Sequence, residues 1–203
     1  MLDPSRWVKY TMLFSNNDLG IFMKYQNLTL RHFTQKLSSA EPVPGGGAVG
    51  ALSCAVASAL SVMVIGIALK RKKLAPKKKV LGQIQRDFKR YSQIGFKSLE
   101  EDPKAYLQVH RSWNKKGHDT ALKQAFEVQR KLASVCQEAV SRNKKLAKIV
   151  KGPLANDISV SNHLLKAAFA TSYSTALINV KCLKNKSLAK KLNSKLKKLR
   201  ISR

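Results

Sequence analysis

The segment EPVPGGGAVGALSCAVASALSVMVIGIALKRKK, residues 41–73, contains the feature that decides the fold. Three glycines follow a Pro-Val-Pro, and residues 48–69 then carry no charged side chain. The four residues that follow, 70–73, are all cationic. This length and composition fit either a membrane-spanning helix flanked by cytoplasmic cations or a helix buried inside a bundle.

Small and polar side chains within the run favour the buried helix. Ser53, Ser58 and Ser61 interrupt the apolar sequence, and alanine is its commonest residue. Such a surface lets neighbouring helices approach on several sides, as at the centre of a soluble bundle or at a dimer interface. We therefore expect residues 48–69 to form a long buried central helix.

The remaining sequence is typical of an all-α protein. Apolar residues recur at intervals of three and four in residues 28–37, 80–99, 121–150 and 156–184. Asp102 followed by Pro103 indicates a helix start, and Gly152 with Pro153 indicates the end of a preceding helix. Alternation typical of strands bounded by hairpin turns is missing from the sequence. We predict an antiparallel bundle of six or seven helices with short connections.

The chain divides into three parts by composition. We expect an N-terminal extension at residues 1–27, a helical domain at residues 28–184 and a basic amphipathic tail helix at residues 185–203. Met1 and Met23 are both candidate starts of the natural product, because the sequence from Met23 reads as a more natural beginning. The tail places leucines on one face among lysines, which suits packing on the bundle better than lying on a membrane surface.

The charge of the chain predicts an anionic partner. Its 39 Lys and Arg against 11 Asp and Glu give a net charge of +28. Such a surface attracts nucleic acid, acidic lipid or a carboxylated small molecule, although a lysine-rich genome would produce part of the same excess. Three widely spaced cysteines indicate a reducing, cytoplasmic setting. The four histidines lack metal-ligand spacing, so we predict no metal.

The three glycines also have two interpretations. They are either a hinge or a side-chain-free approach by which a ligand reaches the first N–H groups of the following helix. Those N–H groups have no partner within the helix, and the helix dipole favours an anion there.

Four stretches of the sequence resemble motifs of one known family. PGGGAVGA at residues 44–51, heading an alanine-rich helix that ends in KRKK, is similar to the cyclodeaminase/cyclohydrolase family. This family comprises the C-terminal half of formiminotransferase-cyclodeaminase and the bacterial methenyltetrahydrofolate cyclohydrolases. DPKAY at residues 102–106 is similar to the family's D-x-x-A-[YF], and Asn156-Asp157 to its S-D pair. A segment containing Asn179 matches another of its motifs, and the resemblance covers about residues 28–184.

The resemblance implies a soluble, cytoplasmic, all-helical homodimer that acts on one-carbon derivatives of tetrahydrofolate. The expected reaction is hydrolysis of methenyltetrahydrofolate to 10-formyltetrahydrofolate, or cyclodeamination of formiminotetrahydrofolate. Both need a general acid or base, and a carboxyl group in an apolar cleft serves as either. The folate, with one or several glutamates, is the substrate, and no tightly bound cofactor is expected.

We expect two catalytic carboxylates, Asp157 first and Asp102 second. Asp157 is the last acidic residue in the chain and the first that follows Glu138. A helix-capping role is the alternative for both. The resemblance and the charge pattern give these substrate-binding residues: Pro44, Gly45, Gly46, Gly47, Lys70, Lys72, Lys73, Tyr106 and Asn179.

Departures from the family's pattern keep other interpretations open. Ala68, Leu74, Ser61 with Val62, Asn156 and Thr175 stand where the family has other residues, and the loop at residues 151–155 is shorter. One alternative is a family member that keeps the fold without catalysis. Another is a basic helical protein that binds nucleic acid. This alternative is less favoured, because the tail is nearly free of aromatic residues and the sequence contains no known nucleic-acid recognition motif.

Overall fold

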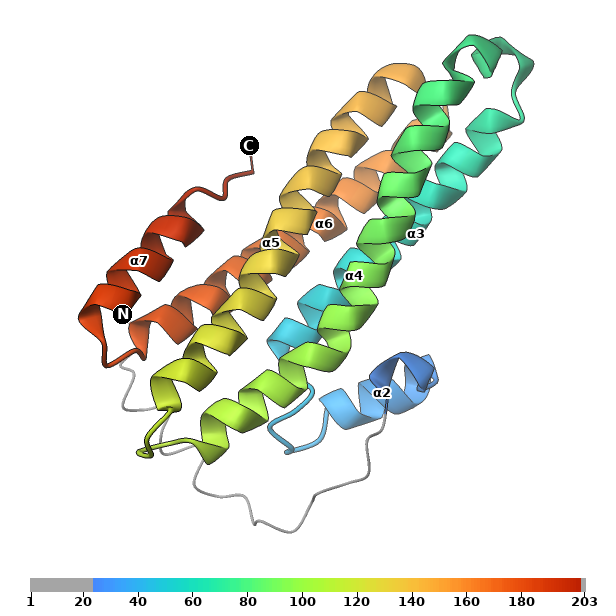
Figure 1. Ribbon diagram of the computed structural model, residues 1–203. Helices are drawn as coiled ribbons and strands as arrows, with labels where there is room; N and C mark the ends of the chain where they lie inside the picture. The colour runs from blue at the N-terminus through green and yellow to red at the C-terminus, as the bar shows by residue number, and fades with distance from the viewer. Residues whose placement is uncertain (1–23, 202–203) are drawn as a thin grey trace.

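The computed structural model describes residues 24–201 as an antiparallel helical bundle (Figure 1). Its four long helices are α3 (Gly46–Leu69), α4 (Lys78–Arg111), α5 (His118–Ile149) and α6 (Leu154–Lys181). The shorter elements are η1 (Tyr25–Asn27), α2 (Leu30–Leu37), η2 (Lys72–Lys77) and α7 (Lys186–Lys197). The six α-helices, with no strand among the described residues, confirm the all-α prediction. The expected extension up to Met23 falls outside the described residues.

Helix α3 is the apolar helix expected from the sequence, and it packs between α4 and α6. Among the described residues it is the one helix long and apolar enough to cross a bilayer. Its inner face is fully buried and consists mostly of small residues. These residues are Ala48, Ala51, Cys54, Ala55, Ala57, Val64, Ile65 and Ala68. The inner face of α3 is therefore core, whereas Val49, Val56, Met63 and Ile67 on its outer face remain exposed in the single chain.

Small residues allow α3 and α4 to cross very closely. A Cβ atom built on Gly95 of α4 would lie 2.8 Å from the backbone nitrogen of Ala55 and 2.9 Å from the carbonyl oxygen of Ala51. Real Cβ atoms do not approach backbone atoms so closely. The spacing of these two helices therefore depends on a glycine on one side and alanines on the other.

A buried polar cluster joins α3, α5 and α6 in the half of the bundle away from the three glycines. The Ser61 hydroxyl donates to Asn143 Oδ1 at 3.0 Å, and Asn143 Nδ2 donates to Ser161 Oγ at 2.9 Å. Ser161 Oγ then donates to the carbonyl oxygen of Ala57 at 2.9 Å. All three side chains are inaccessible to solvent. Because an unpaired buried polar group costs about 1–3 kcal/mol, the cluster favours one register of the three helices.

The structure corrects two predicted helix boundaries. Helix α4 continues through Pro103, so Asp102 lies inside a helix and does not cap one. Proline removes one backbone hydrogen bond, but the long apolar face of α4, buried against the core, outweighs that cost. Helix α6 begins at Leu154, with Pro153 as its cap. Asp157 therefore lies in the first turn of α6 and is not its capping residue.

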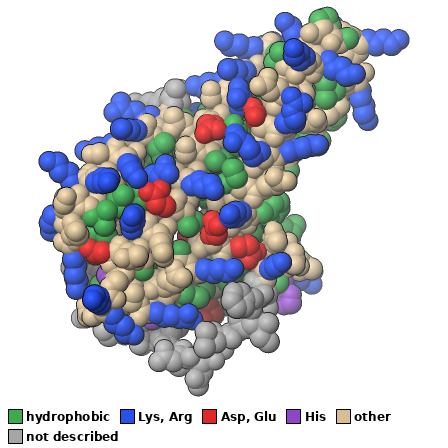
Figure 2. Space-filling model, in the orientation of Figure 1, with side chains coloured by type: hydrophobic (Ala, Val, Ile, Leu, Met, Phe, Trp, Pro, Cys, Tyr) green, Lys and Arg blue, Asp and Glu red, His purple; other side chains and the backbone are tan. Residues whose placement is uncertain are grey.

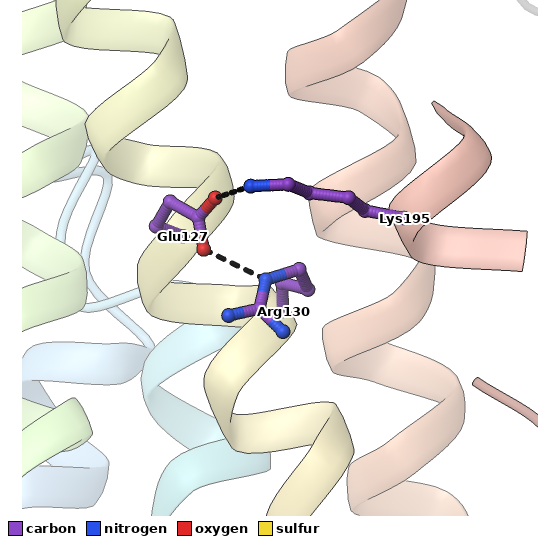
Figure 3. A network of polar contacts seen from close by, with 3 residues as sticks. All are labelled: Glu127, Arg130 and Lys195. Atoms are coloured by element: carbon purple, nitrogen blue, oxygen red, sulfur yellow. Dashed lines mark hydrogen bonds and ion pairs between the residues drawn. The ribbon is translucent and has the colours of Figure 1, made fainter. Parts of the chain in front are cut away.

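The basic tail forms α7 and packs on α5 and α6. Leu192 and Leu196 are buried in a second apolar cluster with residues of α5 and α6. Glu127 of α5 accepts from Arg130 at 2.7 Å and from Lys195 of α7 at 3.4 Å (Figure 3). This packing favours the bundle-bound interpretation of the tail over the membrane-surface one.

The Gly95 crossing leads to a prediction about stability. We expect Gly95→Ala to lower the free energy of unfolding by about 1–3 kcal/mol, because the new methyl group would overpack the α3 backbone. Gly82→Ala, on the same helix, is the matched control, since its Cβ would have only Arg86 Nη1 within 4 Å, at 3.9 Å. The control should gain about 0.5–1 kcal/mol from helix propensity. Urea unfolding followed by circular dichroism measures both, and equal effects would contradict the close crossing.

Candidate active site

The first turn of α3 lies against α4 and α5. Pro44 is buried, and Gly45 precedes the helix in an extended conformation. Helix α3 then starts at Gly46 and not at Ala48, where the sequence predicted the helix start, so Gly46 and Gly47 belong to the helix. The backbone N–H of Ala48, which has no acceptor within the helix, donates to the Asp102 side chain.

Asp102 and Gln129 meet at this helix start. Gln129 Nε2 donates to Asp102 Oδ1 at 2.6 Å. A Cβ atom on Gly47 would overlap both the Asp102 carboxyl group and the Gln129 amide. The approach of these two side chains to the α3 backbone therefore requires glycine at position 47. The Asp102 carboxyl group, the Gln129 amide and the first turn of α3 together form what we call the carboxylate–amide centre.

Burial raises the pKa of Asp102, and this is the largest influence on it. The hydrogen bonds from Gln129 and Ala48 act in the opposite direction, because they stabilise the ionised form, but they do not cancel the effect of burial. A carboxyl group with a raised pKa keeps its proton to higher pH and is better suited to donate it to a leaving group.

Gln129 was not predicted as a site residue. Its side chain is 1% exposed, and its Oε1 has no hydrogen-bond partner among the described residues. Buried amide oxygens nearly always have a donor, so this atom is suited to accept an N–H from a ligand or a water. The sequence carried a signal for it. Gln129 is a polar residue on the buried stripe of α5, three positions from both Phe126 and Leu132.

Two other predicted residues lie at the same end of the bundle. Tyr106 is one helical turn after Asp102, on the same side of α4, and burial raises the pKa of its phenol. A Cβ on Gly50 of α3 would lie 3.2 Å from Thr171 Cγ2 of α6. Because α6 runs antiparallel to α3, Asn179 lies about 12 Å beyond Thr171 toward the glycine end.

Asp157 lies toward the opposite end of the bundle. It precedes Thr171 by about 21 Å along the axis of α6, so one chain does not bring it to the glycines. Its side chain is half-buried and makes no hydrogen bond or ion pair within residues 24–201. Lys70, Lys72 and Lys73 are exposed at this same end, where Arg71 Nη1 donates to the Lys151 carbonyl oxygen at 3.4 Å.

The first turn of α3 in the carboxylate–amide centre is open on its outer side in the single chain. Gly46 is exposed, and among the described residues no atom from outside its own helical turn lies within 4 Å of the position that its Cβ would take. Two shallow depressions on the described surface flank α4 near Asp102. One is lined mainly by α5 residues such as Thr120 and Glu127, the other by residues of α4 with Gln26, and neither by Asp102 itself. Within residues 24–201, no group of three or more His, Cys, Asp or Glu could hold a metal ion.

The fold and this centre define a class: an antiparallel helical bundle that presses a partly buried carboxyl group against a side-chain-free helix start. The family model of formiminotransferase-cyclodeaminase matches residues 29–198. The chain therefore belongs to the formiminotransferase-cyclodeaminase family, as its motifs predicted.

A solved structure agrees with this assignment. The chain is similar to formiminotetrahydrofolate cyclodeaminase from Thermotoga maritima, with 26% sequence identity and a TM-score of 0.82. The match covers 86% of this chain and 89% of the other. A comparison with curated protein sequences found no significant match.

The raised pKa of Asp102 predicts how stability depends on pH. Folding raises this pKa, so the folded protein loses stability as pH rises from the unfolded-state pKa, about 3.9, through the folded-state pKa. Asp102→Asn keeps an acceptor oxygen but cannot ionise. We expect its melting temperature to match that of the original chain near pH 4 and to exceed it increasingly toward neutral pH.

Thermal unfolding at a series of pH values measures this difference. Glu101→Gln is the control, because Glu101 is more exposed and makes its ion pair with Lys97 on the surface of α4. A melting-temperature difference for Asp102→Asn that stays constant with pH, or that equals the difference for the control, would contradict the argument.

Proposed function

We propose that the chain is an enzyme of one-carbon metabolism that cyclodeaminates formiminotetrahydrofolate and hydrolyses methenyltetrahydrofolate at the carboxylate–amide centre. The observation that carries the proposal is Asp102, partly buried and hydrogen-bonded to Gln129, at the glycine start of α3. Family membership and the similar cyclodeaminase structure support the folate substrate class.

Cyclodeamination requires one proton from outside the substrate at the departing nitrogen. The second folate nitrogen attacks the formimino carbon and its proton passes to the former imine nitrogen, which gives a tetrahedral carbon with three nitrogen substituents, one of them an amino group. A second proton converts this amino group into an ammonium group, its bond to the carbon breaks, and ammonia leaves. Asp102 in its neutral form supplies the proton, and its raised pKa favours this role. The product is the cationic methenyl bridge.

Gln129 positions the departing nitrogen in this proposal. Its free Oε1 accepts an N–H from the nitrogen, while its Nε2 holds Asp102 Oδ1. For hydrolysis of the methenyl bridge, a water takes the place of the ammonia. Asp102 in its ionised form then removes a proton from that water as the water oxygen bonds to the methenyl carbon, which is the reverse of its role as a proton donor. One carbon–nitrogen bond of the bridge then breaks, the released nitrogen takes the proton back from Asp102, and the carbon remains as a formyl group on the other nitrogen.

The exposed apolar face of α3 suggests a homodimer. The outer face of α3 exposes Val49, Val56, Met63 and Ile67, each between 36% and 49%. These residues form one apolar stripe along the helix, which favours burial against a second copy. If two α3 helices pack antiparallel, the partner subunit's Asp157 and its cations at residues 70–73 come beside the glycines of the first chain.

This arrangement would close the open side of the centre. In it, Lys70, Lys72 and Lys73 bind the carboxylates of the folate's glutamate tail, and Asp157 is the second catalytic carboxylate. Pro44, Gly45, Gly46 and Gly47 line the site with Tyr106 and Asn179. Cytoplasmic location follows from the substrate class in this proposal, and no tightly bound cofactor is required by the chemistry.

The absorbance of the methenyl bridge tests both reactions. With formiminotetrahydrofolate we expect the absorbance to appear, and with methenyltetrahydrofolate we expect it to decay faster than in buffer. Asp102→Asn should lower kcat by about 10²–10⁴-fold, because a general acid or base contributes that much. Glu101→Gln, which replaces the neighbouring acid, should retain activity. A purified chain with no rate above buffer for either substrate would support the alternative of a fold kept without catalysis.

Mixing two inactive variants tests whether the site is shared between subunits. If each site combines Asp102 from one chain with Asp157 from the other, Asp102→Asn and Asp157→Asn should both be inactive alone. Co-expression of the two should restore part of the activity, because some dimers then contain one intact site. A monomeric chain in solution, or an active Asp157→Asn variant, would contradict the shared site.

A further inference from the structure

The end of the bundle opposite the carboxylate–amide centre concentrates positive charge. Residues 70–79 contain seven lysines and arginines, and residues 144–151 contain four more, all of them exposed. The Arg71–Lys151 hydrogen bond shows that the two segments lie side by side. We call these exposed cations the basic end. Figure 2 shows Lys and Arg side chains surrounding this end of the molecule.

Almost no acidic side chain neutralises the basic end. Residues 42–86 and 139–156 contain no Asp or Glu; the acids that flank them in the sequence are Glu41, Asp87, Glu138 and Asp157. The nearby carboxylates Asp87 and Glu138 pair instead with Arg142 and Arg90. None of the ion pairs formed within residues 24–201 includes a cation of the basic end.

Several of these charges are placed unfavourably for folding. Lys77 caps the amino end of α4, and Lys78 and Lys79 occupy its first turn, which has no acidic residue. The helix dipole disfavours cations at this position. The mutual repulsion of these cations lowers the stability of the folded protein further. A contribution to folding therefore does not explain why they occur here.

The other side chains at the basic end indicate the kind of anion. Its two segments contain no aromatic residue and hence no platform on which a base could stack. Leu74 packs against the core, and neither segment exposes a large apolar side chain that could enter a lipid layer. The chemistry favours a hydrophilic polyanion with regularly repeated charges, which is the phosphodiester backbone of a nucleic acid.

We infer that the basic end binds the phosphate backbone of nucleic acid without reading its sequence. In the proposed dimer Lys70, Lys72 and Lys73 of this end also bind the folate's glutamate tail, so the inference rests on the remaining cations, those at residues 77–79 and 144–151. Nucleic-acid binding requires neither Asp102 nor Gln129, so loss of one activity leaves the other measurable.

The test is the binding of a fluorescein-labelled 20-nucleotide RNA, followed by anisotropy at several salt concentrations. The variant Lys77→Gln, Lys78→Gln, Lys79→Gln, Lys148→Gln removes four charges from the basic end. We expect it to weaken binding at least tenfold near 100 mM salt. The slope of log K against log salt should also fall by roughly 3, because each lost phosphate contact on a single strand contributes about 0.7.

A second variant with the same change in net charge is the control. Lys186→Gln, Lys190→Gln, Lys191→Gln, Lys198→Gln removes four exposed lysines of α7 and its end. It should change affinity less than threefold, and Asp102→Asn should not change it. A duplex DNA of the same length distinguishes the sources of phosphate, and binding to either supports the inference.

Three results would overturn the inference. Equal weakening by both lysine variants would show that binding follows net charge and not the basic end. Absence of RNA and DNA binding at 100 mM salt would exclude the site. Tighter binding to vesicles containing phosphatidylserine than to either nucleic acid would assign the basic end to a lipid surface.

Discussion

The structure depends on how closely the backbone of α3 is approached by its neighbours. Gly95 of α4 faces Ala51 and Ala55, Thr171 of α6 faces Gly50, and Asp102 and Gln129 reach the backbone at Gly47. Each approach needs a small or absent side chain on one partner, which explains why α3 is rich in alanine and glycine. The same property makes α3 resemble a membrane span in composition, so only its neighbours decide between the two interpretations.

The carboxylate–amide centre follows from this close packing. A carboxyl group pressed against a helix start loses water, and the loss outweighs the two hydrogen bonds that it gains there. The fold thus holds Asp102 in a state that weakens the folded protein at neutral pH and suits it for proton transfer. Gln129 also lowers the stability of the folded protein, because burial leaves its Oε1 without a hydrogen-bond partner within the described residues.

The sequence predicted the parts of the structure that depend on local pattern. Apolar spacing predicted the other helices, the uncharged run predicted α3, and the motifs predicted the family and placed Asp102 among the candidates. The sequence did not predict that Gln129 meets Asp102, because that contact joins residues 27 apart and depends on the rotation of two helices. Pro103 misled the boundary prediction, since the buried face of α4 outweighs one missing hydrogen bond. The predicted helix over residues 156–184 already places Asp157 and Asn179 at its opposite ends, but which of the two lies beside the glycines depends on helix direction, which the motifs do not encode.

The buried cluster of Ser61, Asn143 and Ser161 has a consequence for how the bundle loosens. It connects three helices in the half of the bundle nearer the basic end, whereas the glycine end carries a carboxyl group that has lost water on burial. Thermal opening should therefore begin at the glycine end and reach the Ser61–Asn143–Ser161 cluster last. The end that holds Asp102 is then free to change shape around a ligand while the cluster keeps the three helices aligned.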